Sequence, residues 1–381
     1  MLKIIKERRR LPILMALILT GTAAGCKDPE PAASLQAVTI GAWNVQALFD
    51  GDENGGEYRE YSASSGWSGE KYSARMTALS RALAPVAPDI LALIEVENGG
   101  VLEALAKDRL GDQGYHWTFF AGNPGAALGI GLLSRFPLTR TRAHSGGYQG
   151  KDIPRPILEA WVDAGGAPLV IFACHWKSKL GGDQETEAQR RSSAWIINRR
   201  IEEIRRENPG VPVIILGDLN ENYDEFYRQA GAYISALLPD VPEAAELSGF
   251  TGDSRGKRAD FLVISGEKPP RAAYFPPEVA AFYSPWAGEL PEGAGSYSYK
   301  NAWETIDHFL LSEALFDGSG WEFEACQVLN REPFLNGKGY PDAYNPRTGI
   351  GLSDHLPLLL TLKKASPGTG TAEPPLSEGM W

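Results

Sequence analysis

The chain contains 381 residues, of which 43% are hydrophobic and 10% aromatic, so it is a globular protein with room for one large domain or two smaller ones. Its formal net charge is −11. The first 25 residues carry five Lys or Arg and one Glu, so removing them leaves about −15, which excludes a general polyanion-coating protein but not an enzyme that binds phosphates locally.

The N-terminus has the pattern of an export signal. Five basic residues within the first ten are followed by an apolar run at residues 11–19, which is too short to span a bilayer. The segment ends in Thr-Ala-Ala-Gly-Cys, which resembles a bacterial lipobox with Cys26 as the lipidated residue, although Ala23 stands where Leu is usual. We predict a lipoprotein signal peptide over residues 1–25 and a polar tether over residues 26–37. The alternative is an ordinary cleaved signal with an incidental Cys26.

Nine strand-like runs follow in chain order, at residues 37–45, 90–94, 128–133, 157–162, 169–173, 211–216, 305–311, 321–329 and 356–362. Helical patterns occupy residues 71–83, 101–110 and 183–206. In the last of these Ala194, Ile197, Ile201 and Ile204 share one face, while arginines populate the others. This mixture of hairpin-like and helix-separated strands predicts sheets layered with helices rather than a purely parallel sheet.

Residues 221–300 differ from the rest, because Pro, Gly and aromatic residues are frequent and no long period holds. We predict a loop-rich insertion on the surface there, within a domain that spans residues 38–364. Residues 365–381 form a tail rich in Pro, Gly, Ser and Thr that we expect to be disordered. Cys174 and Cys326 either pair in an oxidising envelope or remain buried apolar residues, and they are too few for a zinc site.

Polar residues stand at the ends of five predicted strands. They are Asn44, Glu95, His175, Asp218 with Asn220, and Asp354 with His355. Each has a structural explanation by itself: a turn former, a solvent-facing strand end, or a Gly-Asp turn that caps the next helix. Together they predict one polar rim, because it is improbable that five apolar strands end in Asn, Glu, Asp or His by coincidence.

The rim has the chemistry of a divalent metal site. The side chains that offer only oxygen are Asn44, Glu95, Asp218, Asn220 and Asp354. Oxygen ligands suit Mg²⁺, Mn²⁺ or Ca²⁺ rather than Zn²⁺, and carboxylates clustered without a cation would repel one another. We predict Mg²⁺, for which Mn²⁺ or Ca²⁺ can substitute. With His175 and His355 nearby, such a site suits hydrolysis of a phosphate ester.

The motifs WNVQ, LIEVEN, HWKSK, GDLN, TIDHFLLS and SDHLP, in this order and spacing, resemble the endonuclease/exonuclease/phosphatase superfamily over residues 38–362. The resemblance implies an α/β fold, a four-layer α/β/β/α sandwich of two packed mixed sheets. It also implies metal-ligand roles: Glu95 as the principal carboxylate with Asn44 beside it, and Asp354 as a further ligand. Asp218 and Asn220 would orient the attacking water and the phosphate.

The resemblance assigns the remaining catalytic roles as well. His355 acts as general base or phosphate contact, and Asp307 orients its imidazole. His175 is the second histidine, a general acid or phosphate ligand, and Arg155 binds phosphate. Strand alternation places His308 on the face opposite Asp307, which indicates a structural residue.

The segments around HWKSKLGGD and SYSYKNAWE resemble secreted bacterial nucleases of this superfamily. Lys177, Lys179 and Arg190, or Arg191 in its place, would then meet phosphates. The aromatic residues Tyr297, Tyr299 and Trp303 would either stack on bases or pack the insertion.

We therefore expect a metal-dependent nuclease that acts on DNA, or on RNA, at the cell envelope or outside the cell. It would be a monomer, anchored to a membrane through Cys26, with no protein partner. One alternative is a sphingomyelinase-like or other phosphodiesterase or phosphatase. The second is a non-catalytic binding lipoprotein. Inositol 5-phosphatases are disfavoured, because Leu216 precedes GDLN where that branch would have Trp.

Overall fold

The computed structural model describes residues 35–250, 258–291 and 293–365. The predicted signal peptide, Cys26, nearly all of the tether and the tail after residue 365 lie outside these residues. Within them, no helix combines the length and apolarity that a membrane crossing requires.

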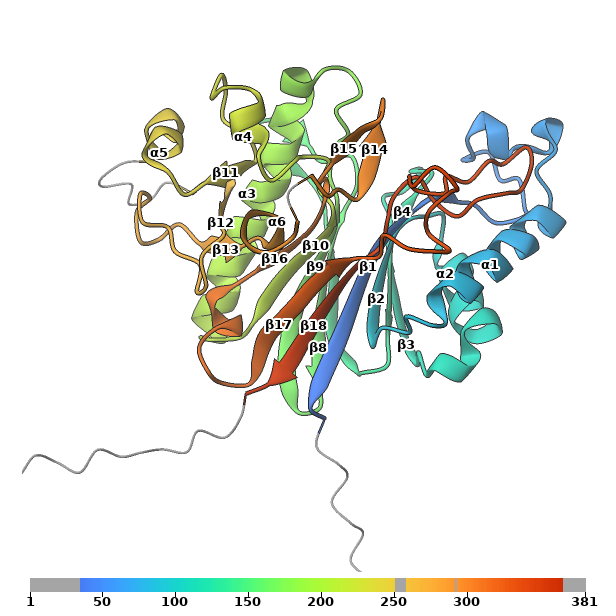
Figure 1. Ribbon diagram of the computed structural model, residues 1–381, viewed down its shortest axis with the longest axis horizontal. Helices are drawn as coiled ribbons and strands as arrows, with labels where there is room; N and C mark the ends of the chain where they lie inside the picture. The colour runs from blue at the N-terminus through green and yellow to red at the C-terminus, as the bar shows by residue number, and fades with distance from the viewer. Residues whose placement is uncertain (1–34, 251–257, 292, 366–381) are drawn as a thin grey trace, which may run out of the picture. The chain divides into compact units, whose positions relative to one another are not determined.

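Two mixed sheets form the centre of the described chain (Figure 1). The six-stranded sheet has the order β17-β18-β1-β2-β4-β3, with β1 (Ala37–Leu48), β2 (Ile90–Val96), β3 (Trp117–Ala121), β4 (Gly129–Ser134), β17 (Trp321–Val328) and β18 (Leu358–Lys364). The eight-stranded sheet has the order β11-β12-β13-β16-β10-β9-β8-β5, with β5 (Leu138–His144), β8 (Ile157–Ala164), β9 (Ala167–His175), β10 (Val213–Asp218), β11 (Leu237–Pro239), β12 (Leu262–Ser265), β13 (Ala281–Tyr283) and β16 (Asp307–Leu311). Two ribbons are separate, β6 (Gly147–Tyr148) with β7 (Lys151–Asp152) and β14 (Tyr297–Tyr299) with β15 (Ala302–Glu304).

The helices cover the outer faces of both sheets. The described helices are α1 (Gly69–Leu83), α2 (Gly99–Ala104), α3 (Asp183–Glu207), α4 (Glu225–Arg228), α5 (Pro242–Ser248) and α6 (Pro285–Gly288), of which α6 instead contributes Trp286 to the core between the sheets. Alternate residues such as Ile94 and Phe309 fill the space between the sheets, because side chains of a strand point to opposite faces. On the outer faces α3 packs through Ile197 on the eight-stranded sheet, and α1 packs through Leu79 on the six-stranded sheet. The predicted α/β/β/α sandwich is confirmed.

All nine predicted strands are present, with ends shifted by a few residues. Residues 221–300 are mostly loop, but they do not lie only at the surface. This segment contributes β11, β12 and β13, which extend the eight-stranded sheet beyond β16, and side chains such as Phe261 and Val263 are buried. Strands of three or four residues are too short to show an alternating pattern, so the sequence did not reveal them.

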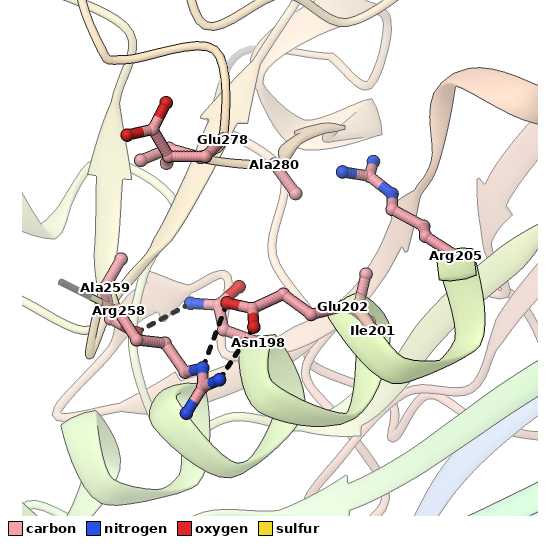
Figure 2. A pocket seen from close by; sticks show the side chains of 9 residues that line it. Asn198, Ile201, Glu202, Arg205, Arg258, Ala259, Glu278 and Ala280 are labelled. Carbon is pink, nitrogen blue, oxygen red and sulfur yellow. Dashed lines mark hydrogen bonds and ion pairs between the residues drawn. The ribbon is translucent and has the colours of Figure 1, made fainter. Parts of the chain in front are cut away.

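Polar contacts hold this extension on α3 (Figure 2). Asn198 Nδ2 donates to Ala259 O at 3.0 Å and to Phe261 O at 2.7 Å. Arg258 forms an ion pair with Glu202, one turn further along the helix. The helix thus fixes the start of β12 by satisfying backbone carbonyls that the sheet leaves free.

Cys174 and Cys326 are free thiols, and both are buried. They lie in different layers, since Cys174 packs beneath α3 and Cys326 between the sheets. Burial raises the pKa of both thiols, so they remain protonated and behave as small apolar residues. Of the two alternatives open from the sequence, the structure has the unpaired one.

Candidate active site

The predicted rim residues converge where strands of both sheets end. In the eight-stranded sheet Asp218 is paired in register with His175 on one side and with Asp307 on the other. From the facing sheet, Asn44 Nδ2 donates to Asp218 Oδ2 at 3.0 Å and to Glu95 Oε1 at 3.2 Å. The amide of Asn44 therefore bridges carboxylates that belong to different sheets.

The backbone next to Asn44 is bulged, which brings Glu95 into the site. Gln46, Ala47 and Glu95 have φ values of 54°, 56° and 69°, a left-handed conformation that non-glycine residues seldom adopt. The register between β1 and β2 shifts at this point. The bulge allows Ala47 N to donate to Glu95 Oε2 at 2.8 Å, and this hydrogen bond fixes the carboxylate. Such strained backbone persists only where the surroundings hold it.

Arg75 of α1 holds the bulge, and the sequence analysis did not single it out. Its side chain is buried, and its guanidinium donates to the carbonyl oxygens of Val45, Gln46 and Ala47, the last at 3.1 Å. Among the described residues Arg75 has no carboxylate partner. An arginine on the apolar face of a helix, next to Met76, was the available signal in the sequence.

His355 is tied to Asp307. Its Nδ1 lies 2.8 Å from Asp307 Oδ2, and Ser296 Oγ donates to the same oxygen at 2.6 Å. Burial disfavours the imidazolium, but the charge and hydrogen bond of Asp307 outweigh it and raise the pKa of His355 to about 10. An imidazole with this raised pKa is protonated at neutral pH, which favours the phosphate contact among the two roles predicted for His355.

His175 has the opposite electrostatics. Burial, together with the positive charges of Arg155 and His355, lowers its pKa well below the usual value, so the ring is neutral. Its Nε2 lies 3.6 Å from Asp218 Oδ2 and 3.7 Å from Glu95 Oε1. Its Nδ1 is buried without a hydrogen-bond partner among the described residues.

Asp218 lies between the two histidines, and burial and the Asp307 charge raise its pKa to about 7. Its oxygens, with those of Asp307 and a ring nitrogen of His355, come within 4.8 Å of one another, which is close enough to hold a metal ion. Because His355 already forms a charged pair with Asp307, we regard Asp218 and Glu95 as the better ligands. A hard divalent cation would stabilise a buried carboxylate such as that of Asp218, whose pKa is raised without it.

Three other predicted residues line the same edge. Asn220, with φ at 52°, donates from its backbone N to Asp218 Oδ1 at 2.9 Å and from Nδ2 to Trp176 O at 3.1 Å. Arg155 donates to Trp176 O at 3.3 Å. Asp354 is half-buried, and its Oδ1 lies 4.0 Å from His355 Nε2. Asn44 Oδ1 accepts from Gln46 N, and its Nδ2 faces the carboxylates of Glu95 and Asp218.

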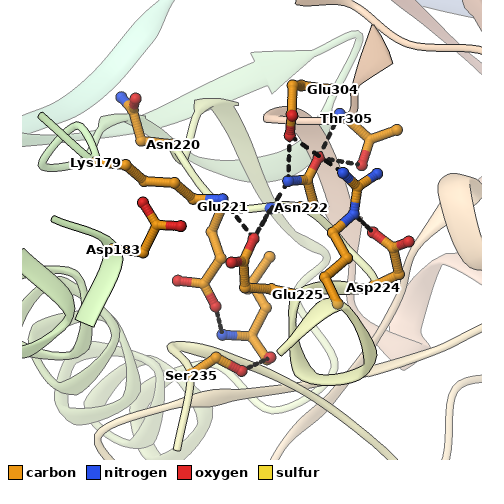
Figure 3. Close-up of polar contacts among 12 residues, drawn as sticks. Lys179, Asp183, Asn220, Glu221, Asn222, Asp224, Glu225, Ser235, Glu304 and Thr305 are labelled. Atoms are coloured by element: carbon orange, nitrogen blue, oxygen red, sulfur yellow. Dashed lines mark hydrogen bonds and ion pairs between the residues drawn. The ribbon is translucent and has the colours of Figure 1, made fainter. Parts of the chain in front are cut away.

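The basic residues predicted to bind phosphate are mostly engaged by the protein itself, and Figure 3 shows this for Lys179, which points to Glu225. Lys179 is paired with Glu225, and Lys177 Nζ folds back onto Ser178 O and Leu180 O.

The structure contradicts the phosphate-binding role predicted for Arg190. Its guanidinium is fully buried and forms ion pairs with Glu187 and Glu221. Its alternative, Arg191, is paired with Asp260. Neither arginine is therefore available to a substrate without breaking an ion pair.

The predicted aromatic residues fall into different environments. The ring of Tyr297 lies over His355, with centroids 4.7 Å apart and planes 33° apart. Tyr299 is 54% exposed on the β14–β15 ribbon. Trp303 packs against Tyr340 with centroids 5.7 Å apart, so packing explains this residue. His308 lies on the face opposite Asp307, buried, with Nε2 2.8 Å from Glu221 O.

Comparisons with known proteins agree with this architecture. The sequence model of the Endonuclease/Exonuclease/phosphatase family matches residues 41–355. Truncated TDP2 from Caenorhabditis elegans aligns with a TM-score of 0.50 at 16% identity, covering 86% of this chain and 97% of that chain. TDP2 from D. rerio, complexed with single strand DNA product, aligns with a TM-score of 0.50 at 15% identity, covering 86% and 99%.

The human Nocturnin catalytic domain with bound sulfate aligns with a TM-score of 0.49 at 15% identity, covering 86% of this chain and 94% of that chain. No curated protein matches the chain. At such identities the structural likeness establishes the fold. The family match covers most of the sequence and includes the site residues from Asn44 to His355, so the chain belongs to the endonuclease/exonuclease/phosphatase family.

Proposed function

We propose that the protein is a metal-dependent phosphodiester hydrolase whose substrate is nucleic acid, DNA foremost. The observation that supports this most is the convergence of Glu95 and Asp218 from facing sheets between His175 and the His355–Asp307 pair. Oxygen donors beside a cationic imidazole suit a phosphodiester, which is an anion that gains charge on its leaving oxygen during hydrolysis.

Each residue has a role that follows from its position. Glu95 and Asp218 would hold a divalent cation such as Mg²⁺, which supplies Lewis-acid stabilisation of phosphate charge when bound. His355 contacts the phosphate as an imidazolium and is kept in orientation by Asp307. Asp218 would also orient the attacking water and accept its proton through the carboxylate oxygen that does not hold the cation. Arg155, beside His175, binds a phosphate oxygen.

The direction of β1 favours a soluble polymer over a bilayer lipid as the substrate, because it sets the distance between the start of the domain and the site. Ala37 begins the strand and Asn44 lies at the site, so about 23 Å separates them at roughly 3.3 Å per residue. If the chain is anchored through Cys26 at the cell envelope, as we propose, the tether joins the domain at the end remote from the site. The TDP2 structure from D. rerio illustrates that this fold accepts a DNA strand.

A substrate panel tests the proposal. The purified mature chain should cleave plasmid DNA or RNA with Mg²⁺ or Mn²⁺, and should not do so in EDTA or as the His355→Gln variant. Sphingomyelin vesicles and p-nitrophenyl phosphate complete the panel. Turnover of sphingomyelin without nucleic acid cleavage would replace the nuclease by the lipid phosphodiesterase. If no phosphate ester is hydrolysed and no divalent ion shifts the melting temperature, a binding protein is the better explanation.

A further inference from the structure

Asn222 is a buried polar residue on the loop between β10 and α4, four residues after Asp218, and it is 1% exposed. Its side-chain oxygen accepts from Thr305 N at 2.7 Å and from Thr305 Oγ1 at 3.2 Å. Its Nδ2 donates to Glu225 Oε2 at 3.2 Å and to Glu304 Oε2 at 2.5 Å (Figure 3). An amide side chain has two donor hydrogens and one oxygen with two lone pairs, so all of these groups are used.

Three adjacent strands bring site residues to one edge of the eight-stranded sheet, at the positions where their pairing ends. β9 ends at His175, β10 ends at Asp218 and β16 begins at Asp307, and these residues are paired in register. One residue further on, Leu219 N donates to Ile306 O at 2.8 Å. Because a sheet fixes the chain only along its paired residues, side-chain contacts past this edge decide how firmly the three strand ends are spaced.

Asn222 and its partners join the continuations of all three strands. Thr305 leads into β16 two residues later, and Lys179 follows the end of β9 by four residues. Lys179 Nζ pairs with Glu225 at 2.5 Å, on the same carboxylate oxygen that accepts from Asn222 Nδ2. Burial disfavours a charge on Glu225, but the Lys179 charge and the hydrogen bonds from Asn222 outweigh it and lower the pKa of Glu225, so this acceptor stays ionised.

The side-chain amide of Asn222 takes the place of a peptide group between β10 and β16. Its oxygen accepts from the backbone N of Thr305, as the carbonyl of a neighbouring strand would. A buried amide that loses these partners leaves unpaired polar groups, which costs free energy unless the chains move. A change that makes the side chain repel its partners should therefore separate the end of β10 from the start of β16, and with it Asp218 from Asp307.

We propose that Asn222 is a positioning residue of the active site, which holds the Asp218 end of β10 at a fixed distance from Asp307 and so from His355, the residue that Asp307 orients. The inference rests on the proposed hydrolase function and adds a residue to it. Because Asn222 is buried, it acts through these residues and not by contact with a substrate. A displacement of about 1 Å in a catalytic group can lower the rate about a hundredfold, so the effect belongs to kcat.

The variant Asn222→Asp keeps the shape of the side chain but replaces the donating amide by an oxygen that faces the carboxylates of Glu225 and Glu304. With bis(p-nitrophenyl) phosphate and Mg²⁺, at a temperature where the variant is fully folded, kcat should fall about ten- to hundredfold. KM should stay near the parent value, since Asn222 does not touch the substrate. A kcat per folded molecule equal to that of the parent would overturn the inference.

The matched control is Asn198→Asp. Asn198 is also a buried amide whose Nδ2 donates to two acceptors, Ala259 O and Phe261 O, but it holds the start of β12 on α3 instead of the catalytic strands (Figure 2). It should lower the melting temperature as Asn222→Asp does, and kcat of the folded protein should not change. Equal losses of kcat in both variants would mean that kcat follows stability, against a positioning role. Should either variant fail to fold, Asn222→Ala and Asn198→Ala are compared by the same criterion.

The double variant N222D/E304Q tests the contact itself. The second substitution supplies an amide that can donate to the introduced carboxylate, and the net charge of the network returns to that of the parent. Most of the kcat that N222D loses should be recovered. E304Q alone should keep the parent's kcat, because Gln retains an oxygen that accepts from Asn222 Nδ2. A folded double variant without any recovery of kcat would contradict the assigned contact.

The activity of the parent separates failure of this inference from failure of the proposed function. If the parent hydrolyses bis(p-nitrophenyl) phosphate or DNA and Asn222→Asp keeps its kcat, the positioning role is wrong and the hydrolase stands. If the parent hydrolyses no phosphate ester, the proposed function fails. Crystal structures of the parent and of Asn222→Asp then decide the inference, since an unchanged distance between the Asp218 and Asp307 carboxylates would overturn it.

Discussion

His355 Nδ1 lies 2.8 Å from Asp307 Oδ2, on the far side of the ring from the edge where the phosphate would lie. The carboxylate keeps the imidazole protonated up to a pH near its pKa of about 10. Asp307→Asn removes the charge but not the shape, so kcat should fall by about 10² to 10⁴.

The pH profile of Asp307→Asn distinguishes this role from a structural one. A raised pKa means that the imidazolium is present below about pH 10 and lost above it. Without the Asp307 charge the alkaline limb of kcat should move toward the ordinary histidine value of about 6.5. Ser296→Ala is the control, because it removes only the hydroxyl that is hydrogen-bonded to Asp307. Its alkaline limb of kcat should stay at the pH of the parent's. An unmoved limb in Asp307→Asn would exclude electrostatic coupling.

Glu95→Gln should weaken metal binding while preserving the fold. Gln retains an oxygen that can accept from Ala47 N, so the bulge persists, but one negative charge near the cation is lost. The apparent dissociation constant for Mn²⁺, measured by calorimetry, should rise by at least about tenfold, and excess Mn²⁺ should restore part of the activity. Glu97→Gln is the neighbouring control, because Glu97 accepts from Asp50 N instead. Equal Mn²⁺ affinity in parent and variant would remove Glu95 from the metal site.

Arg75→Met tests whether the buried arginine positions Glu95. Removing the guanidinium leaves the carbonyls of Val45, Gln46 and Ala47 without their donor, so the free energy of unfolding should fall by about 2–4 kcal/mol. The bulge should then relax, and the affinity for Mn²⁺ should weaken about tenfold. Urea unfolding and calorimetry measure the two effects. Arg81→Met, an exposed position on the same helix, should change neither; a stability loss with unchanged Mn²⁺ affinity would make Arg75 purely structural.

The motif residues could be predicted because each ends an apolar strand. Asp218 follows a run that can only be a buried strand, and a charge there signals a site. Arg75 gave a weaker signal, because its place on the apolar face of a helix does not distinguish a buried arginine from an interruption of that face. The contact between Gln46 and Tyr344 joins residues 298 apart in sequence, and no local pattern encodes it. Tertiary pairing of this kind appears only when the strands and loops are placed in space.

The burial of Arg190 could not be predicted from the sequence either. It lies on a helix that is polar over most of its surface, and such a helix gives no sign of which arginine is buried. In the structure its guanidinium lies between Glu187 and Glu221, directly behind the segment that carries Asn220. Arg190→Met should leave two buried carboxylates uncompensated and lower the free energy of unfolding by about 3–5 kcal/mol in urea.

The control for Arg190→Met is Arg191→Met, the next residue, whose pair with Asp260 is partly exposed and should contribute at most about 1 kcal/mol. Equal losses in the two variants would contradict the buried pair. The triple variant Arg190→Met, Glu187→Met, Glu221→Leu removes the arginine and both buried carboxylates. It should recover most of the free energy of unfolding that Arg190→Met loses, because that loss comes from leaving carboxylates buried without a cation. A triple variant less stable than Arg190→Met would show that the carboxylates also stabilise the fold through the Ala236 and Leu237 amides that donate to them.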